Sequence, residues 1–320
     1  MLSLQCRPVI CGAGIAVVFL CAQLHAQANS SGQPAEPSFG FKMAVDEVSL
    51  TLSAVDSHGL AVNDLRADEL RLLDNGKAPR KILAFDAMKD FPIRAGILLD
   101  TSESMEAHVR ADRAIATQFA LHVLRQQTDE AFVMDFGYVS KIEQAWTSSS
   151  AALSTAVGNV SAEKQNPLSG TALFDTVFRA CFHEFGKLDP KASGNFVLLF
   201  TDGEDNKSHT SLDEAVDICQ KSNTAIYVFR AEPASSMSSG PKNLAELARE
   251  TGGRVFRDDE SDATLIDDLK TIEANLRNQY RLVYRPEEIR RDGSFHQIVV
   301  LGPERVANIT VRSGYYAPKQ

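Results

Sequence analysis

The sequence has few of the features that mark several common classes of protein. It has 5 cysteines in 320 residues, and three of them lie within the first 21 positions, which excludes a scaffold held together by many disulfides. No cluster of lysine and arginine stands out against the formal net charge of -9, so we expect no nucleic-acid partner. The 7 histidines form no pair with the spacing of zinc ligands, which argues against a histidine-based zinc enzyme.

Long apolar runs are also missing, except near the N-terminus. There, the apolar run "VICGAGIAVVFLCAQL" follows a single basic residue, Arg7, and precedes Ala26 and Ala28, which are spaced like a cleavage site. This pattern predicts a signal peptide over residues 1–28, and the polar residues 29–41 predict a flexible leader. An uncleaved anchor is the alternative. We therefore expect an exported protein, periplasmic or extracellular, whose mature chain has no membrane span.

Two cysteines remain after the predicted signal peptide, Cys181 and Cys219. Both lie in segments with helical patterning, so two buried free thiols are the simpler interpretation. A single disulfide, formed in an oxidising compartment, is the alternative that the sequence leaves open.

The pattern of apolar residues divides the rest of the chain into three parts. Residues 42–90 alternate apolar and polar side chains around the turn signal Asp74-Asn75-Gly76, which predicts a small antiparallel β unit. Residues 280–320 have the same character and should add strands that pack with that unit. Between them, residues 91–279 alternate fully apolar strands with helical segments, the last of them over residues 262–279. This order predicts a doubly wound, mostly parallel Rossmann-like α/β sheet, inserted in a β domain built from both chain ends.

Oxygen-bearing side chains follow the predicted strands in three separate loops. Asp100 ends the apolar strand "AGILLD" and is followed by Ser102 and Ser104; Thr171 belongs to "SGT", and Asp202 to "TDGED". Because the carboxyl ends of parallel strands share one edge of a sheet, the three loops should converge there. Hydroxyl and carboxylate oxygens without nitrogen or sulfur suit Mg²⁺, Ca²⁺ or Mn²⁺.

Alternation along the first loop supports this interpretation. In an extended loop, Asp100, Ser102 and Ser104 would face the same way, and Thr101 and Glu103 would face outward. Helix capping is the alternative for single residues such as Ser104 and Thr171. Because all three loops occur together and in order, we favour a metal site.

The three loops, "DTSES" with Met105 after it, "SGT" and "TDGE", resemble the metal-ion-dependent adhesion site (MIDAS) of von Willebrand factor A domains over residues 92–278. The flanking stretches "LLDNGK", "YRLVY" and "SGYYAP" resemble the exported bacterial, acidobacterial-type VWFA-related family. The resemblance implies direct coordination by the hydroxyls of Ser102, Ser104 and Thr171, with Asp100 and Asp202 acting directly or through water.

The resemblance also implies a function. It predicts a binding module without enzymatic activity, whose divalent cation captures an Asp or Glu of a protein partner. Glu204 and Asp205 follow the Asp-Gly pair, and we expect them at the rim of the site. The alternatives are a metal-assisted hydrolase of phosphate esters and a structural cell-envelope protein stabilised by its metal.

Overall fold

The computed structural model of the chain describes residues 47–58, 60–88, 92–162, 169–188, 194–231, 238–257, 269, 272–274, 276–288 and 290–318. The predicted signal peptide and leader lie outside the described residues, as does most of the helix expected over residues 262–279. The chain from Phe41 to Gln320 forms one compact unit. The domain boundaries within it stay predictions.

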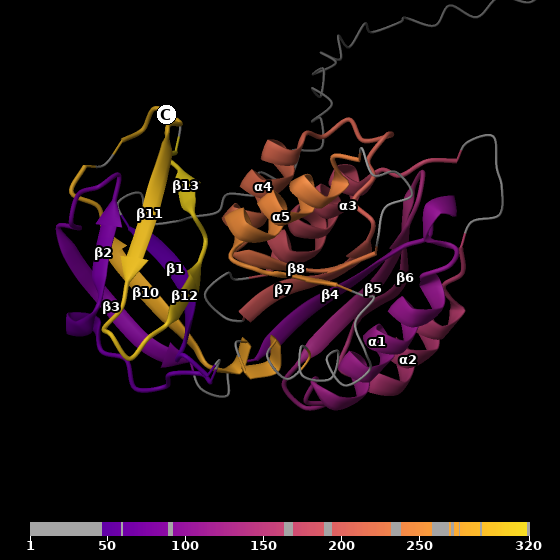
Figure 1. The fold of residues 1–320 in the computed structure, drawn as a ribbon, viewed down its shortest axis with the longest axis horizontal. Helices are drawn as coiled ribbons and strands as arrows, with labels where there is room; N and C mark the ends of the chain where they lie inside the picture. Colours follow the sequence, from indigo (N-terminus) through magenta and orange to yellow (C-terminus); the bar gives the residue numbers. More distant parts are fainter. Residues whose placement is uncertain are drawn as a thin grey trace, which may run out of the picture. The chain divides into compact units, whose positions relative to one another are not determined.

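A six-stranded sheet forms the centre of the α/β part, in the order β6-β5-β4-β7-β8-β9 (Figure 1). The β6-β5 pair is antiparallel and the other pairs are parallel. The strands are β4 (Ile93–Asp100), β5 (Glu130–Phe136), β6 (Ser140–Thr147), β7 (Gly194–Thr201), β8 (Thr224–Arg230) and β9 (Val255–Arg257). The predicted mostly parallel α/β fold is thereby confirmed. Strand β7 is buried along its whole length, as its continuous apolar run predicts.

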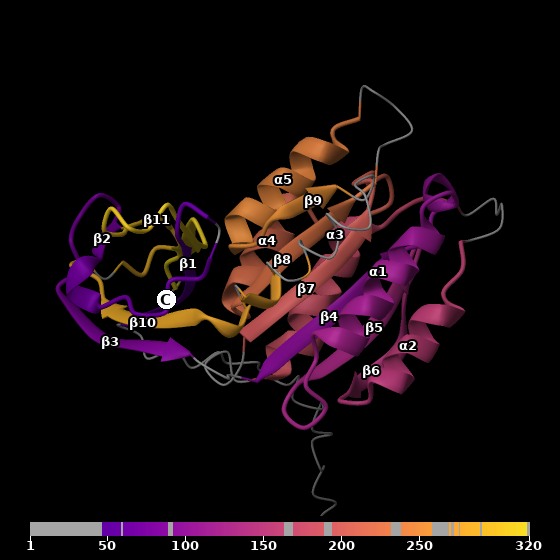
Figure 2. The same ribbon diagram turned by 60° about the horizontal axis from the view of Figure 1, so that its bottom comes forward.

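Helices cover both faces of this sheet (Figure 2). One face packs on α1 (Val109–His122) and α2 (Ser150–Asn159). The other face packs on α3 (Leu173–Arg179), α4 (Leu212–Lys221) and α5 (Gly240–Thr251). Successive strand residues point to opposite faces, so Ile97 belongs to the first core and Leu98 to the second. The two cores cover both faces of the sheet beneath the loops at its carboxyl edge.

Cys181 and Cys219 form a disulfide, with their Cα atoms 5.0 Å apart. Cys181 lies in the π-helical turn η3 (Ala180–Glu184), which continues α3 and is followed by the 3-10 turn η4 (Phe185–Lys187); Cys219 lies in α4. The interpretation as two free thiols is therefore wrong. Both cysteines are buried where α3 and α4 pack against each other, a contact between helices that spacing along the sequence does not reveal.

The strands from the two ends of the chain form two antiparallel sheets, ordered β12-β1-β10-β3 and β13-β11-β2. Figure 1 shows the early strands in indigo beside the late strands in yellow. The strands are β1 (Val48–Val55), β2 (Arg71–Asp74), β3 (Lys81–Met88), β10 (Gln279–Arg285), β11 (Phe295–Leu301), β12 (Asn308–Val311) and β13 (Gly314–Tyr316), with the 3-10 turn η1 (Ala67–Glu69) before β2. The β domain built from both chain ends is confirmed. Of the strands near the C-terminal end of the described chain, β12 and β13 follow each other closely but lie in different sheets.

A buried polar network ties these strands together around Asp74. The Asp74 Oδ1 atom lies 2.8 Å from His296 Nδ1. The hydroxyls of Tyr284 and Tyr315 donate to Asp74 Oδ2 at 2.8 Å and 2.9 Å. Each of the four residues comes from a different strand, so the network joins β2 near the start of the chain to β10, β11 and β13 near its end.

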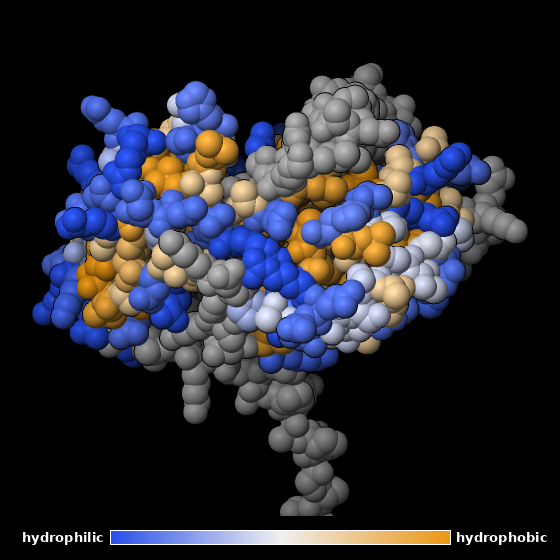
Figure 3. Space-filling view, turned by 90° about the horizontal axis from the view of Figure 1, so that it is seen from below, coloured by the Kyte–Doolittle hydropathy of each residue, from blue (hydrophilic) through white to orange (hydrophobic). Residues whose placement is uncertain are grey.

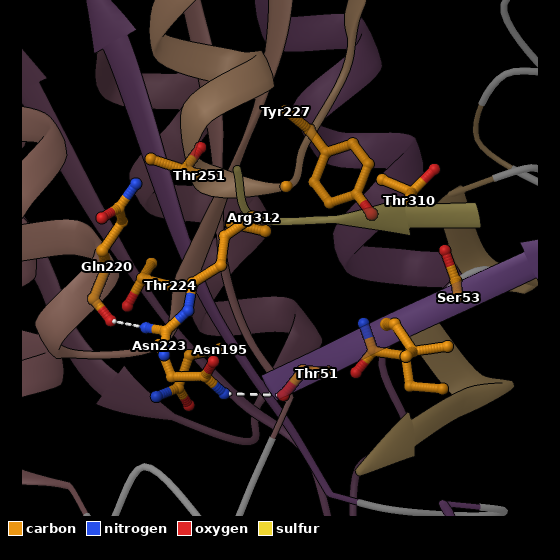
Figure 4. A pocket seen from close by; sticks show the side chains of 14 residues that line it. Thr51, Ser53, Asn195, Gln220, Asn223, Thr224, Tyr227, Thr251, Thr310 and Arg312 are labelled. Carbon is orange, nitrogen blue, oxygen red and sulfur yellow. Dashed lines mark hydrogen bonds between the residues drawn. The ribbon is translucent and has the colours of Figure 1, made fainter. Parts of the chain in front are cut away.

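Arg312 joins the β sheets to the α/β part (Figure 4). Its guanidinium donates to the carbonyl of Gln220 at 2.8 Å and to the carbonyl of Ser49 at 2.9 Å. Gln220 is near the C-terminal end of α4, where a positive charge is favourable. Nearby, Asn223 donates to Thr51 at 2.8 Å. The polar cavity beside these residues measures about 30 Å³, which is room for about two water molecules and too little for a substrate.

The surface is mixed in character. On the face shown in Figure 3, hydrophobic side chains gather in separate patches with hydrophilic residues between them. Among the described residues, the structure contains no helix with both the length and the apolar character needed to cross a membrane.

Candidate metal centre

Asp100, the last residue of β4, is held on both of its carboxylate oxygens. Oδ1 accepts a hydrogen bond from the backbone N–H of Ser102 at 2.9 Å, and Oδ2 accepts one from the hydroxyl of Thr201 at 2.6 Å. Asp100 is only 1% exposed. Burial raises the pKa of Asp100 to about 7, and the nearby negative charge of Asp202 adds to the rise. A cation at this point would offset both unfavourable effects.

The hydroxyls of Ser102 and Ser104 lie side by side, with their Oγ atoms 3.3 Å apart. The loop is not extended, because a 3-10 turn, η2 (Glu103–Met105), begins directly after Ser102. Glu103 is exposed as expected. Thr101 contradicts the predicted alternation: it is buried, and its hydroxyl donates to the carbonyl of Phe136 at 3.0 Å.

The capping alternative is not realised at the helices that follow these loops. The residue before α1 is His108, and the residue before α3 is Ala172; neither side chain caps its helix. Ser102 precedes η2 but makes no side-chain cap there. The hydroxyls of Ser102, Ser104 and Thr171 are therefore not explained by helix capping.

The second and third loops are joined through Thr171. Its backbone N–H donates to Asn206 Oδ1 at 3.0 Å, and its carbonyl accepts from the N–H groups of Asn206 and Lys207, both at 3.1 Å. Gly170 makes this contact possible. It has φ of +141°, and a Cβ there would lie 2.3 Å from Lys207 Cε. Its positive φ, which other residues rarely adopt, and the close approach of the third loop together favour glycine at this position of "SGT".

The first and second loops are joined through the end of β5. The carbonyl of Phe136 accepts from the backbone N–H of Thr101 at 2.7 Å, and the carbonyl of the next residue, Gly137, accepts from Ala172 at 2.8 Å. Two consecutive carbonyls therefore hold the two loops against the same strand end. Together with the Thr201–Asp100 bond, these contacts bring all three predicted loops to one place on the sheet edge.

The buried carboxylate of Asp202 is the strongest indication that a cation binds at this site. It is 1% exposed, and its Oδ1 accepts from the N–H of Glu204 at 3.0 Å. Its Oδ2 is buried and has no hydrogen-bond partner among the residues that the structure describes. A buried carboxylate oxygen without a partner is costly, and a cation or a water bound to one would satisfy it. The donor set of carboxylate and hydroxyl oxygens fits a hard divalent ion.

The third loop is held in position by α5. Gly203 has φ of +85°, and a Cβ there would lie 2.8 Å from the carbonyl oxygen of Gly240, the first residue of α5. The backbone of the loop therefore rests directly on the helix. A larger residue at position 203 would push Asp202 away from the other loops.

The two acidic residues after Gly203 have different surroundings. Glu204 is partly exposed. The carboxylate of Asp205 instead accepts from the N–H groups of Phe174 and Ser208, both at 3.0 Å, and so caps the first turn of α3. The sequence does not reveal this capping role of Asp205, which was expected only at the rim. Thr201 and Asn206 are likewise not apparent from the sequence, where their only signal is their position beside Asp202 and Asp205.

In the part of the chain that the structure describes, no group of three or more His, Cys, Asp or Glu side chains could hold a metal. The site described above has two carboxylates and depends on three hydroxyls for its remaining ligands. Its chemistry therefore differs from that of a typical zinc centre built from nitrogen and sulfur.

Comparisons with known proteins add the following. No curated protein matches the chain. Matching solved structures include the conserved hypothetical protein BatB from Bacteroides thetaiotaomicron, which is 18% identical, with 56% of this chain and 97% of that chain covered and a TM-score of 0.44. An aerotolerance-related membrane protein from Bacteroides fragilis is also 18% identical, with 56% and 98% covered and a TM-score of 0.44. Proximal thread matrix protein 1 from the mussel byssus, with a zinc-occupied MIDAS motif, is 15% identical, with 64% and 50% covered and a TM-score of 0.49.

With identities and TM-scores this low, the likenesses to solved structures carry no argument about function. The family assignment rests on a different match. The family model of the von Willebrand factor type A domain matches residues 96–274, which is more than half of the chain. This range contains all three loops of the candidate metal centre. The chain belongs to the von Willebrand factor type A family.

Proposed function

We propose that the three loops form a metal-ion-dependent adhesion site that captures an acidic side chain of a protein partner. The observation that carries the proposal is the buried Asp202 Oδ2, which lacks a hydrogen-bond partner within the described part of the chain, in a place where hydrogen bonds join all three loops. The ion is Mg²⁺, or Ca²⁺ or Mn²⁺ in its place. Its ligands are the hydroxyls of Ser102, Ser104 and Thr171, with the carboxylates of Asp100 and Asp202 bound directly or through water.

The chemistry of this ligand set explains why the partner is acidic. Where Asp100 and Asp202 act through water, the directly bound ligands are neutral hydroxyls, so the ion keeps a strong preference for another anionic oxygen. Ser104 is exposed while the other four residues are buried, so the ion would face solvent on the side of Ser104. A carboxylate from a partner can complete the coordination there.

The function is binding, without turnover, and it operates outside the cytoplasm. The buried Cys181–Cys219 disulfide supports export, because such bonds persist mainly in oxidising compartments. The predicted signal peptide gives the route, and the likeness of the flanks to the exported VWFA-related family agrees with it. The mature chain would thus act in the periplasm or outside the cell.

Isothermal titration calorimetry with Mg²⁺, Ca²⁺ and Mn²⁺ tests the metal site. We expect a single binding site in the wild-type chain. Asp100→Ala combined with Ser102→Ala should weaken binding by at least about 100-fold, because it removes a ligand hydroxyl and a buried carboxylate. Ser161→Ala, at an exposed serine after α2, is the matched control and should bind like wild type.

Circular dichroism of each variant verifies that it is folded. The proposal fails if folded wild-type protein binds none of the three ions. It also fails if the folded double variant binds them as tightly as the control does.

A further inference from the structure

The tip of the β5-β6 hairpin places two exposed apolar side chains next to the metal centre. Tyr138 is 41% exposed and Val139 is 65% exposed. The residue before them, Gly137, accepts the hydrogen bond from Ala172, the immediate neighbour of the proposed ligand Thr171. Adjacent exposed apolar side chains at the edge of a polar site favour a contact surface.

Lys207 adds a positive charge to the same side of the site. Its backbone N–H is bound to the carbonyl of Thr171, and its side chain lies across Gly170, where a Cβ would touch it. Its ammonium lies 5.8 Å from the centre of the Tyr138 ring, within the range of a cation–π contact. The side chain is thus held between the second loop and the hairpin tip, although it is exposed to solvent.

The first loop carries negative charge. Glu103 and Glu106 are both exposed in and after the η2 turn of the first loop. Beside this loop, the second carboxylate of a partner would meet like charges, whereas beside Lys207 it would meet a cation. The charges around the metal centre therefore favour one direction of approach for an acidic partner.

We infer that the metal centre selects a partner segment with two acidic side chains and one apolar side chain. This inference rests on the proposed function. One carboxylate binds the metal, the second pairs with Lys207, and the apolar side chain packs on Tyr138 and Val139. The surface defined by these three residues sets which acidic segments bind, while the metal supplies the dependence on a divalent cation.

An array of immobilised synthetic peptides tests the inference with the full chain in Mg²⁺ and in EDTA. Each peptide carries one Asp in a Gly/Ser background; further series add a Leu, a second Asp, or both, at every spacing up to four residues. We expect peptides with all three side chains to retain the wild-type chain about tenfold more than peptides with a single Asp, and EDTA to abolish retention.

Two variants assign the preferences to side chains. Lys207→Glu should remove the preference for the second Asp, and Val139→Ser should reduce the preference for Leu, each by about three- to tenfold. Lys187→Glu makes the same change of charge at an exposed lysine in the turn after α3, and should retain peptides like wild type.

Calorimetry with Mg²⁺ separates this inference from the proposed function. If the variants bind Mg²⁺ like wild type but keep the wild-type peptide preferences, the inference is overturned and the metal site stands. Absence of retention of every peptide, or equal retention in EDTA, also overturns it. If wild-type protein binds no divalent ion, both the proposed function and the inference fall.

Discussion

Replacing both Cys181 and Cys219 with alanine should lower the free energy of unfolding by about 4 kcal/mol. The disulfide joins residues with a sequence separation of 38, and the chain-entropy relation gives about 4 kcal/mol at 25 °C for a loop of that length. Both side chains are fully buried, so the loss of two sulfur atoms adds a packing cost in the same direction. The change should be close to the upper end of what single native disulfides contribute.

Metal affinity should survive the same substitution. Cys181 lies ten residues after Thr171, which is about 15 Å along a helix. A change at that distance with no shared hydrogen-bond partner should couple weakly to the site, so we expect the Kd for Mg²⁺ to stay within about twofold.

Urea unfolding followed by circular dichroism, without reductant, measures the stability change, and calorimetry measures the affinity. Fully reduced wild-type protein is the control, because it lacks the bond but keeps both sulfur atoms; it should lose nearly as much stability. Reductant should leave the double variant unchanged. A loss below about 1 kcal/mol in both samples would refute the loop-entropy reasoning.

Three further predictions concern single residues. Asp74→Ala should cost about 3 kcal/mol or more in urea unfolding, because it leaves two tyrosine hydroxyls and a histidine without their buried acceptor. Gly203→Ala should cost about 2 kcal/mol and weaken Mg²⁺ binding about tenfold in calorimetry, since alanine is strained at φ of +85° and would displace the third loop. The Asp129→Asn variant should be less stable than wild type at pH 7, and this difference in stability should shrink as the pH falls. Burial alone would raise the pKa of Asp129, but backbone N–H groups and the guanidinium of Arg277 lower it below its ordinary value. Its contribution is therefore present above about pH 4 and is lost as pH falls through the folded-state pKa, which urea midpoints from pH 2 to pH 7 would show as converging curves.

The positions of Asp100 and Asp202 followed from the sequence because two simple rules agree there. A fully apolar run predicts a strand buried on both faces, and the end of such a strand in a parallel sheet lies at the ligand-binding edge. The same rules predicted the mostly parallel sheet, and alternation of apolar residues predicted the strands at both chain ends. These features depend on local periodicity, which a single sequence contains.

The contacts of Thr101 and Cys181 could not be predicted from the periodicity of the sequence. The alternation rule failed at Thr101 because β4 ends at Asp100 and the chain turns, so that the hydroxyl reaches Phe136 on the neighbouring strand. The disulfide of Cys181 depends on how α3 and α4 pack. Asn206, likewise, acts on Thr171 across a contact between distant segments. Each miss involves a partner that only the tertiary structure brings close.

The pairing of β1 with β10 affects how the chain can fold during its synthesis. Val48 lies opposite Tyr284, so the earliest described strand finds its neighbour only after more than 200 further residues have been synthesised. Until then, the apolar side chains of β1 stay exposed and its backbone N–H and C=O groups stay unpaired. Strands in this state readily associate with other chains. Nascent or truncated forms that stop before β10 should therefore depend on chaperones or be degraded. Only a chain that extends through β10 and β12 can pair both edges of β1.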